Sequence, residues 1–161
     1  MASGLALLVV VTVQRIYELG LARRNTQRLL AAGAHEIGGS HYPVMVALHA
    51  TWLATLWIFG WNRSLVLPFV ALYLLLQVGR VWVLRTLGPR WTTRIIILPG
   101  APRVTAGPFR FFDHPNYVVV ALELPRVSLA LGLWLHAFVF GVLNLAMLSW
   151  RIRVENDGLL S

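Results

Sequence analysis

The sequence predicts an all-α integral membrane protein with about five transmembrane helices, its N-terminus outside the cell and its C-terminus in the cytoplasm. Three observations support this fold class. Of the 161 residues, 58% are hydrophobic and only 12% are charged, about half the charged fraction of a soluble domain. The apolar residues form runs of about twenty, the length that crosses a bilayer. All fourteen basic residues are arginines, and most lie between these runs, where the positive-inside rule places them.

The five spans are expected at residues 2–22, 43–61, 64–84, 117–135 and 137–150. The first run has neither the basic start nor the cleavage site of a signal peptide, and it is interpreted as an uncleaved anchor. Asn62 and Arg63 leave room only for a tight turn, so the second and third spans form an antiparallel hairpin. The fifth run has about fourteen apolar residues, which is short for a span. We therefore expect a thin or re-entrant hairpin around residues 134–136, within one domain over residues 1–161.

A polar segment at residues 85–116, rich in proline and glycine, separates the third and fourth spans. Irregular backbone exposed to lipid would leave unpaired amides that each cost several kcal/mol, so this segment is expected at the membrane surface or folded into the protein. Arginines follow the first, third and fifth spans, while the opposite side carries only Arg63. The three arginine-bearing segments share one side if the number of spans is odd, and that side is then the cytoplasm.

Composition excludes several kinds of chemistry. There is no cysteine, which excludes disulfides, thiolate metal sites and cysteine nucleophiles. The histidines show no metal-ligand spacing, so no metal is expected, and His49 in the second span is interpreted as a hydrogen-bonded packing residue. The net charge of +8 does not indicate nucleic acid, because the arginines flank apolar runs. No P-loop, G-x-S-x-G or G-x-G-x-x-G motif is present.

Three ionisable residues attract attention inside the expected spans, where a charge is costly and commonly functional. Glu123 and Arg126 are three positions apart, so they share a helix face and can pair. Arg80 lies near the end of the third span, and its long side chain is expected to reach the lipid headgroups.

Two polar segments go beyond what a membrane helix requires. Residues 107–117, GPFRFFDHPNY, lead into the fourth span, and residues 151–159, RIRVENDGL, follow the fifth. Both lie on the cytoplasmic side in the expected topology, so they can meet in space. Pro115 suits the first turn of a helix, where the free amides suit a carboxylate or phosphate. Arg151 and Glu155 are four positions apart and project from one helical face.

Together, GPFRFFDHPNYVVVALE and RIRVENDGL resemble the motif pair of the isoprenylcysteine carboxyl methyltransferase family, particularly its small bacterial members. A weaker resemblance extends through RIYELGLARRN, GSHYPVM and RWTTRIIILPG, and so covers most of the chain. The resemblance implies an S-adenosylmethionine-dependent methyltransferase in a bacterial inner membrane, with its site facing the cytoplasm. Arg151 and Glu155 match the family's R-x-x-x-E pair near the reacting centre, while Asn156 stands where the family often has a second acid. The residues implied in cofactor binding are Gly107, Pro108, Arg110, His114, Asn116, Tyr117 and Glu123.

The resemblance leaves the methyl acceptor open between a carboxyl and a hydroxyl group of a lipophilic molecule dissolved in the membrane. Prenylcysteine is the acceptor of the family's eukaryotic members, and the small bacterial members are associated with alkyl-pyrone or phenolic lipids. A carboxylate is already ionised at neutral pH and needs orientation. An enol or phenol benefits from a base, for which Glu155 or His114 is available.

Three alternatives remain beside this reading: an NADPH-dependent membrane reductase of the steroid-reductase-like type, a phospholipid methyltransferase acting on an amine, and a non-enzymatic membrane scaffold. The reductases carry a similar segment but typically place an acid soon after the tyrosine, as in HPNYxxE. Here the acid is Glu123, six residues after Tyr117, and the terminal R-x-x-x-E favours methyl transfer. A scaffold would leave both motifs unexplained. The oligomeric state stays open, because Gly132 and Gly141 suit packing within or between chains.

Overall fold

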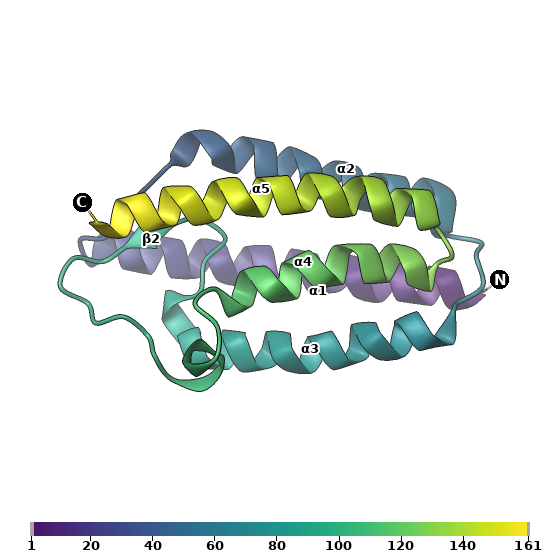
Figure 1. The fold of residues 1–161 in the computed structure, drawn as a ribbon, viewed down its shortest axis with the longest axis horizontal. Coiled ribbons are helices and arrows are strands. Elements are labelled where there is room, and N and C mark those ends of the chain that lie inside the picture. The colour runs from purple at the N-terminus through teal and green to yellow at the C-terminus, as the bar shows by residue number, and fades with distance from the viewer. Residues whose placement is uncertain (1, 161) are drawn as a thin grey trace.

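The computed structural model describes residues 2–160 and, within them, consists of five long helices packed side by side (Figure 1). Consecutive helices run in opposite directions, so the N-terminus lies at one end of the bundle and the C-terminus at the other (Figure 1). The helices are α1 (Ala2–Ala31), α2 (Tyr42–Gly60), α3 (Leu67–Leu87), α4 (Pro115–Ala130) and α5 (Trp134–Leu160).

The shorter elements gather at one end of the bundle, which we call the loop end. It holds residues 88–114 and the C-terminal end of α5 (Figure 1). Two short strands, β1 (His35–Glu36) and β2 (Ile96–Ile97), pair there in antiparallel register. Three 3-10 turns complete it, η1 (Gly39–His41), η2 (Gly88–Arg90) and η3 (Gly107–Arg110). The segments that follow α1 and α3 and the C-terminal end of α5 therefore share one end, as the arginine distribution predicted.

Among residues 2–160, four helices are long and apolar enough to cross a membrane: Ser3–Ala31, Gly39–Gly60, Leu67–Arg90 and Trp134–Gly158. The prediction of an all-α integral membrane protein is confirmed. The remaining helix, α4, has 16 residues, about 24 Å at 1.5 Å per residue, which is less than the roughly 30 Å of bilayer hydrocarbon. The count of five spans and the orientation of the termini stay predictions.

Two helices extend beyond the expected spans. The first helix does not end near residue 22 but continues to residue 31, because no proline or glycine interrupts it after Gly20. The fifth helix does not end at residue 150. It runs without a break through the polar C-terminal motif to residue 160, since arginine and glutamate are good helix formers. The short helix is the fourth, which ends at a tight turn where Gly132 has a φ of 68°.

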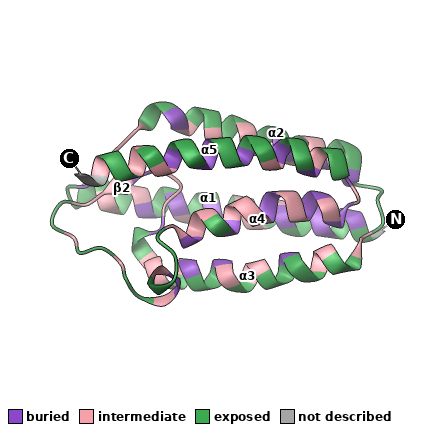
Figure 2. Ribbon diagram, viewed as in Figure 1, coloured by how far each residue is buried: buried purple, intermediate pink, exposed green. Residues whose placement is uncertain are grey.

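The surface of the bundle is largely apolar. Figure 2 shows exposed residues along the outward faces of α2, α3 and α5, and buried residues where α1 and α4 face the interior. Large apolar side chains such as Leu75 (67% exposed) and Phe138 (70% exposed) point outward. Such a surface suits contact with lipid.

A charged cluster lies inside the bundle and consists of Arg15 and Glu18 on α1, Arg80 on α3 and Glu123 on α4. Glu123 Oε2 lies 2.7 Å from Arg15 Nη2 and 2.6 Å from Arg80 Nη1. Arg80 also pairs with Glu18, and Arg15 Nη1 lies 3.4 Å from Glu18 Oε2. Two positive and two negative charges therefore balance within the cluster.

Neutral polar groups from the same helices complete this cluster. Gln77 donates to Glu123 Oε1 at 3.0 Å, and Gln14 donates to Gln77 at 2.7 Å. Tyr73 in turn donates to Gln14 at 2.8 Å. Hydrogen bonds of this kind satisfy the carboxylate oxygens that the arginines leave free.

The two predictions for the charges in the spans are therefore wrong. Arg80 does not extend to the headgroups, because its side chain is 5% exposed and paired with two carboxylates inside the bundle. Glu123 does not pair with Arg126 on its own helix. Its partners come from α1 and α3, on the side of α4 that faces the interior.

The balance of the cluster predicts the effect of removing one charge. Glu123→Gln keeps the shape but leaves Arg15 and Arg80 with one carboxylate between them. Breaking a buried pair in this way costs about 3–5 kcal/mol, measured as a lower unfolding temperature and free energy of the protein in detergent micelles. Arg126→Gln on the same helix is the control, because Arg126 has no ion pair within the described residues. Equal stability of the Glu123 variant and the wild type would contradict this account.

The absence of cysteine makes the predicted orientation directly testable. Asn62, in the turn between α2 and α3, and Thr105, at the loop end, are both exposed. A membrane-impermeant maleimide added to intact bacterial cells should label Asn62→Cys, whereas Thr105→Cys should react only after the cells are opened. The reverse pattern would invert the topology.

Candidate active site

The two sequence motifs meet at the loop end, as predicted. Pro115 and Asn116 occupy the first turn of α4, and Tyr117 follows them. Tyr117 Oη donates a hydrogen bond of 2.7 Å to Glu155 Oε2 on α5. This bond joins residues that are 38 positions apart in the chain.

His114 completes a stack of rings beside Glu155. Its imidazole lies nearly parallel to the Tyr117 ring, with 5.4 Å between ring centroids and 20° between planes. His114 Nδ1 lies 3.7 Å from the Glu155 oxygen that accepts the tyrosine hydrogen bond. The carboxylate of Glu155 therefore lies against a hydroxyl donor and an imidazole.

Arg151 lies one helical turn before Glu155 and is only 3% exposed. Its Nη2 donates to the backbone carbonyl of Thr93 at 2.9 Å, and its Nη1 donates to the sulfur of Met45 at 2.9 Å. The guanidinium carbon lies 5.6 Å from the centroid of the Tyr117 ring. No carboxylate pairs with Arg151 in the part of the chain that the structure describes, and a thioether is a weak acceptor. The guanidinium can therefore still take a strong anionic partner.

Contacts of the loop hold Thr93 in place. Asn25 on α1 donates to the carbonyl of Trp91 at 2.8 Å, and the hydroxyls of Tyr42 and Thr93 lie 3.2 Å apart. Arg94 pairs with Glu36 at 2.8 Å and lies 4.1 Å from the centroid of the Tyr42 ring. Residues 91–94 are thus attached to α1, α2 and β1, which fixes the carbonyl that Arg151 contacts.

Two cavities meet at these residues. The loop cavity, about 260 Å³, opens at the loop end, and its polar lining includes Arg90, Arg94, Arg103, Asp113, His114 and Glu155. The bundle cavity, about 280 Å³, lies between the helices. Its apolar lining includes Val46, Ala50, Trp52, Leu53, Met147 and Leu148.

The two cavities share a wall, which we define as Trp91, Thr92, Asn116, Tyr117 and Arg151. A polar ligand in the loop cavity and an apolar ligand in the bundle cavity would therefore contact the same residues. Such an arrangement can bring two reactants of different solubility together.

The predicted site residues fall into two groups. His114, Asn116, Tyr117, Arg151 and Glu155 all line the loop cavity. The others, described next, lie elsewhere.

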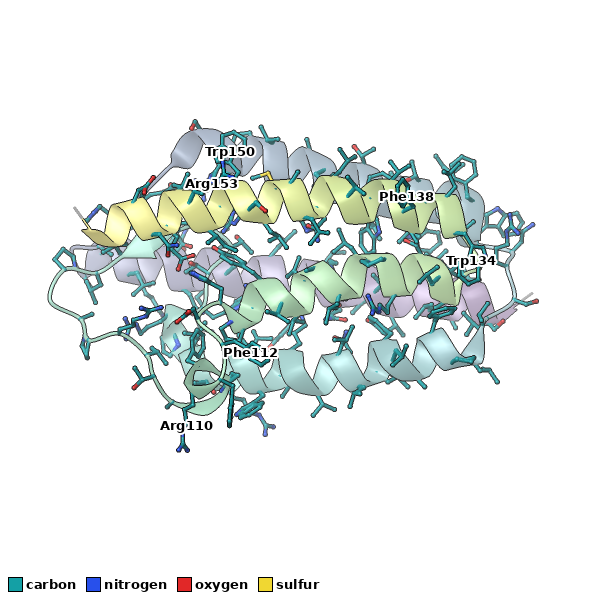
Figure 3. All side chains as sticks on the ribbon, viewed as in Figure 1. Arg110, Phe112, Trp134, Phe138, Trp150 and Arg153 are labelled. Atoms are coloured by element: carbon teal, nitrogen blue, oxygen red, sulfur yellow. The ribbon has the colours of Figure 1, made fainter. Side chains whose placement is uncertain are left out.

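Gly107 and Pro108 pack the loop against α3, where a Cβ at position 107 would collide with the Thr86 hydroxyl oxygen. Arg110 is exposed, and its side chain points away from the bundle (Figure 3). Glu123 belongs to the charged cluster and lines neither cavity.

Sequence reasoning missed several residues that the structure brings to these cavities. Thr93 contributes a backbone carbonyl, which leaves no side-chain signal. Met45 and Trp91 resemble ordinary membrane-helix and interfacial residues. Arg15 and Glu18 gave a usable signal, since two charges three positions apart inside the first apolar run are costly unless paired. Both line the bundle cavity together with Arg80.

Comparisons with known proteins identify the family of this chain. The model of the isoprenylcysteine carboxyl methyltransferase family matches residues 68–161, which include both motifs. The chain is also 35% identical over 158 residues to the uncharacterized protein YpbQ of Bacillus subtilis, covering 95% of this chain and 94% of that protein. No solved structure matches. Since the family model covers more than half of its length, the chain belongs to the isoprenylcysteine carboxyl methyltransferase family.

Proposed function

We propose that this protein is an S-adenosylmethionine-dependent O-methyltransferase that acts on a carboxyl or hydroxyl group of a lipophilic acceptor dissolved in the membrane. Because the chain belongs to this family, the general kind of reaction is that of a membrane methyltransferase. The shared wall is the observation that carries the finer proposal. It separates a polar cavity at the loop end from an apolar cavity between the helices.

The residues around the loop cavity fit the proposed cofactor. S-adenosylmethionine supplies an activated methyl group on a sulfonium, and it also carries a carboxylate and an ammonium. Arg151, which has no carboxylate partner in the described chain, would hold the carboxylate through charge-assisted hydrogen bonds. Glu155 would take the ammonium or a ribose hydroxyl, and the Tyr117 ring would face the sulfonium.

The bundle cavity fits the lipophilic acceptor. Its apolar side chains would bury the hydrocarbon part and exclude water, while the shared wall would orient the polar end. Leu19 on α1 and Val46 on α2 line this cavity and are also 53% and 43% exposed on the lipid-facing surface. A lipid can therefore enter from the membrane between α1 and α2.

One observation also favours the reductase alternative. Besides Arg151, three arginines line the loop cavity, namely Arg90, Arg94 and Arg103, and clustered arginines suit phosphate groups such as those of NADPH. Arg94 and Arg103 already face Glu36 and Asp113, which reduces their availability. Methyl transfer is preferred because the family is one of methyltransferases.

The site, we further propose, faces the cytoplasm of a bacterial cell from its inner membrane. The arginine-bearing segments share the loop end with both motifs, as the positive-inside rule expects for a cytoplasmic face. A water-soluble cofactor made in the cytoplasm would then reach the loop cavity directly.

Ligand-dependent stability discriminates between the two cofactors. S-adenosylhomocysteine at about 100 times its dissociation constant should stabilise the detergent-solubilised protein by about 2.7 kcal/mol, seen as a higher unfolding temperature, while NADPH should give no shift. Arg151→Gln should abolish the shift. Protection by NADPH but not by S-adenosylhomocysteine would contradict methyl transfer and support a reductase.

The stack beside Glu155 predicts two loss-of-function variants. Glu155→Ala and His114→Ala should each lower the transfer of labelled methyl from S-adenosylmethionine to a lipid extract by about 100-fold, because small displacements of a bound ligand cost about that much. Both variants should still insert into the membrane. Asp157→Ala is the matched control, an exposed acid on the same helix. Full activity in either variant would remove that residue from the site.

A further inference from the structure

A patch of exposed aromatic and basic side chains lies at the loop end, outside both cavities. We call it the loop-end patch, and it consists of Trp82 and Arg85 on α3 and of Arg110, Phe111 and Phe112 at the end of η3. Phe111 is 70% exposed and Phe112 is 54% exposed, while Arg110 points away from the bundle (Figure 3). None of the five residues lines the loop cavity or the bundle cavity, so the proposed function leaves them without a role.

The backbone of the turn fixes the exposure of the two phenylalanines. The amides of Phe111 and Phe112 both donate to the carbonyl of Pro108, at 3.2 Å each, and Pro108 is buried. The ring centroid of Phe111 lies 6.3 Å from that of Trp82. Phe111 is therefore held beside α3 while its ring stays exposed.

The loop-end patch lies where the apolar surface of α3 ends. Leu75, Val78 and Trp82 are exposed along one face of this helix, at the spacing of an apolar stripe. The next position of that face is Arg85, which is exposed as well. A tryptophan followed by an arginine at the end of an apolar stripe is typical of the boundary between hydrocarbon and headgroups. Phe111 lies beside Trp82, so its ring is at the depth where acyl chains begin.

The positive charge of the patch is not compensated by the protein. Arg85 and Arg110 form no ion pair with any residue that the structure describes. The acid nearest in sequence to Arg110 is Asp113, which faces Arg103 at 3.4 Å. An anionic phospholipid supplies both missing partners, a phosphate for the guanidinium groups and acyl chains for the rings. A soluble anion would leave the rings in water, and a partner protein would have to reach rings at the depth of the acyl chains.

We propose that the loop-end patch binds an anionic phospholipid of the adjacent leaflet. Arg85 and Arg110 contact headgroup phosphates, and Phe111 and Phe112 insert beside the first carbons of the acyl chains. The combination of basic and aromatic side chains is the one by which protein segments attach to the surface of an anionic membrane. This binding goes beyond the proposed function and does not depend on which reaction the site performs.

The loop-end patch is continuous with the wall of the loop cavity. Phe109 precedes its phenylalanines, Asp113 and His114 follow them, and all three line the cavity. A turn attached to the membrane on one side has less freedom to open on the other. The bound lipid therefore also stabilises the wall of the loop cavity.

Quenching of tryptophan fluorescence tests the lipid preference. In nanodiscs of phosphatidylcholine and phosphatidylglycerol, bromine is placed on the acyl chains of one lipid or the other. Brominated phosphatidylglycerol should quench the wild type more strongly, and Trp82→Phe should remove this difference. Arg85→Gln and Arg110→Gln should each lower the relative affinity for phosphatidylglycerol about fivefold, the effect of one basic residue at an anionic surface. Arg28→Gln removes an exposed charge at the same end of the bundle, on α1, and as the control should leave the preference unchanged.

Amide hydrogen exchange tests the effect on the cavity wall. In nanodiscs that contain phosphatidylglycerol, residues 103–117 of the wild type should exchange about fivefold more slowly than in phosphatidylcholine alone, because a ligand shifts an opening equilibrium by its differential affinity for the two states. The double variant Phe111→Ser, Phe112→Ser should show no such difference. Glycerol phosphate, the soluble part of the headgroup, should not slow exchange in any of these proteins.

Three results would overturn the inference. Equal quenching of the wild type by the two brominated lipids would show that the patch does not select an anionic lipid and would leave it to a partner protein. An equal loss of preference in Arg28→Gln and Arg110→Gln would show that the net charge of the loop end attracts the lipid without a defined site. Slower exchange with glycerol phosphate would assign the arginines to a soluble phosphate.

Discussion

The buried pairing of four charges is the constraint on which the rest of the structure depends. Arg15, Glu18, Arg80 and Glu123 come from three helices, and in an apolar bundle any one of them is costly without its partners. The pairing therefore fixes how far α1, α3 and α4 are displaced along one another. It matters most for α4, which at 16 residues is the helix least able to be held by lipid alone.

This fixed position of α4 reaches the site through the helix itself. Tyr117 lies six residues before Glu123 on the same rigid element, and its hydroxyl meets Glu155 of α5. From the other direction, close packing of Gly107 on Thr86 attaches the preceding loop to α3. The shared wall is thus supported by the bundle on one side and by the loop on the other, so its side chains can keep one geometry while ligands enter and leave both cavities.

The sequence predicts the fold class and the meeting of the motifs, but it fails where partners are distant. Hydropathy identifies where a helix leaves the lipid and not where it ends. The expected fifth span therefore ends at residue 150, although the helix continues through Arg151 and Glu155. Local spacing favoured pairing of Glu123 with Arg126, whereas the partners are 108 and 43 positions away. The meeting of His114, Tyr117 and Glu155 could be predicted, because it required only that the two motifs lie at the same end of the bundle. Thr93 contributes its backbone carbonyl. Every residue type has this group, so the sequence does not indicate the role.

The proposed function accounts for two cavities that share a wall at Arg151. A methyl donor with a carboxylate, an ammonium and a sulfonium is soluble in water, while the proposed acceptor is soluble in lipid, and neither medium dissolves both. A wall of side chains that lines both cavities removes the need for either reactant to leave its own medium. Arg151 can serve in that wall because its present partners, a carbonyl and a thioether, leave its charge uncompensated, so that an incoming anion gains more there than in water. A buried charge without a counter-ion also costs free energy when no ligand is bound. The hydrogen bonds from Arg151 to Thr93 and Met45 reduce that cost.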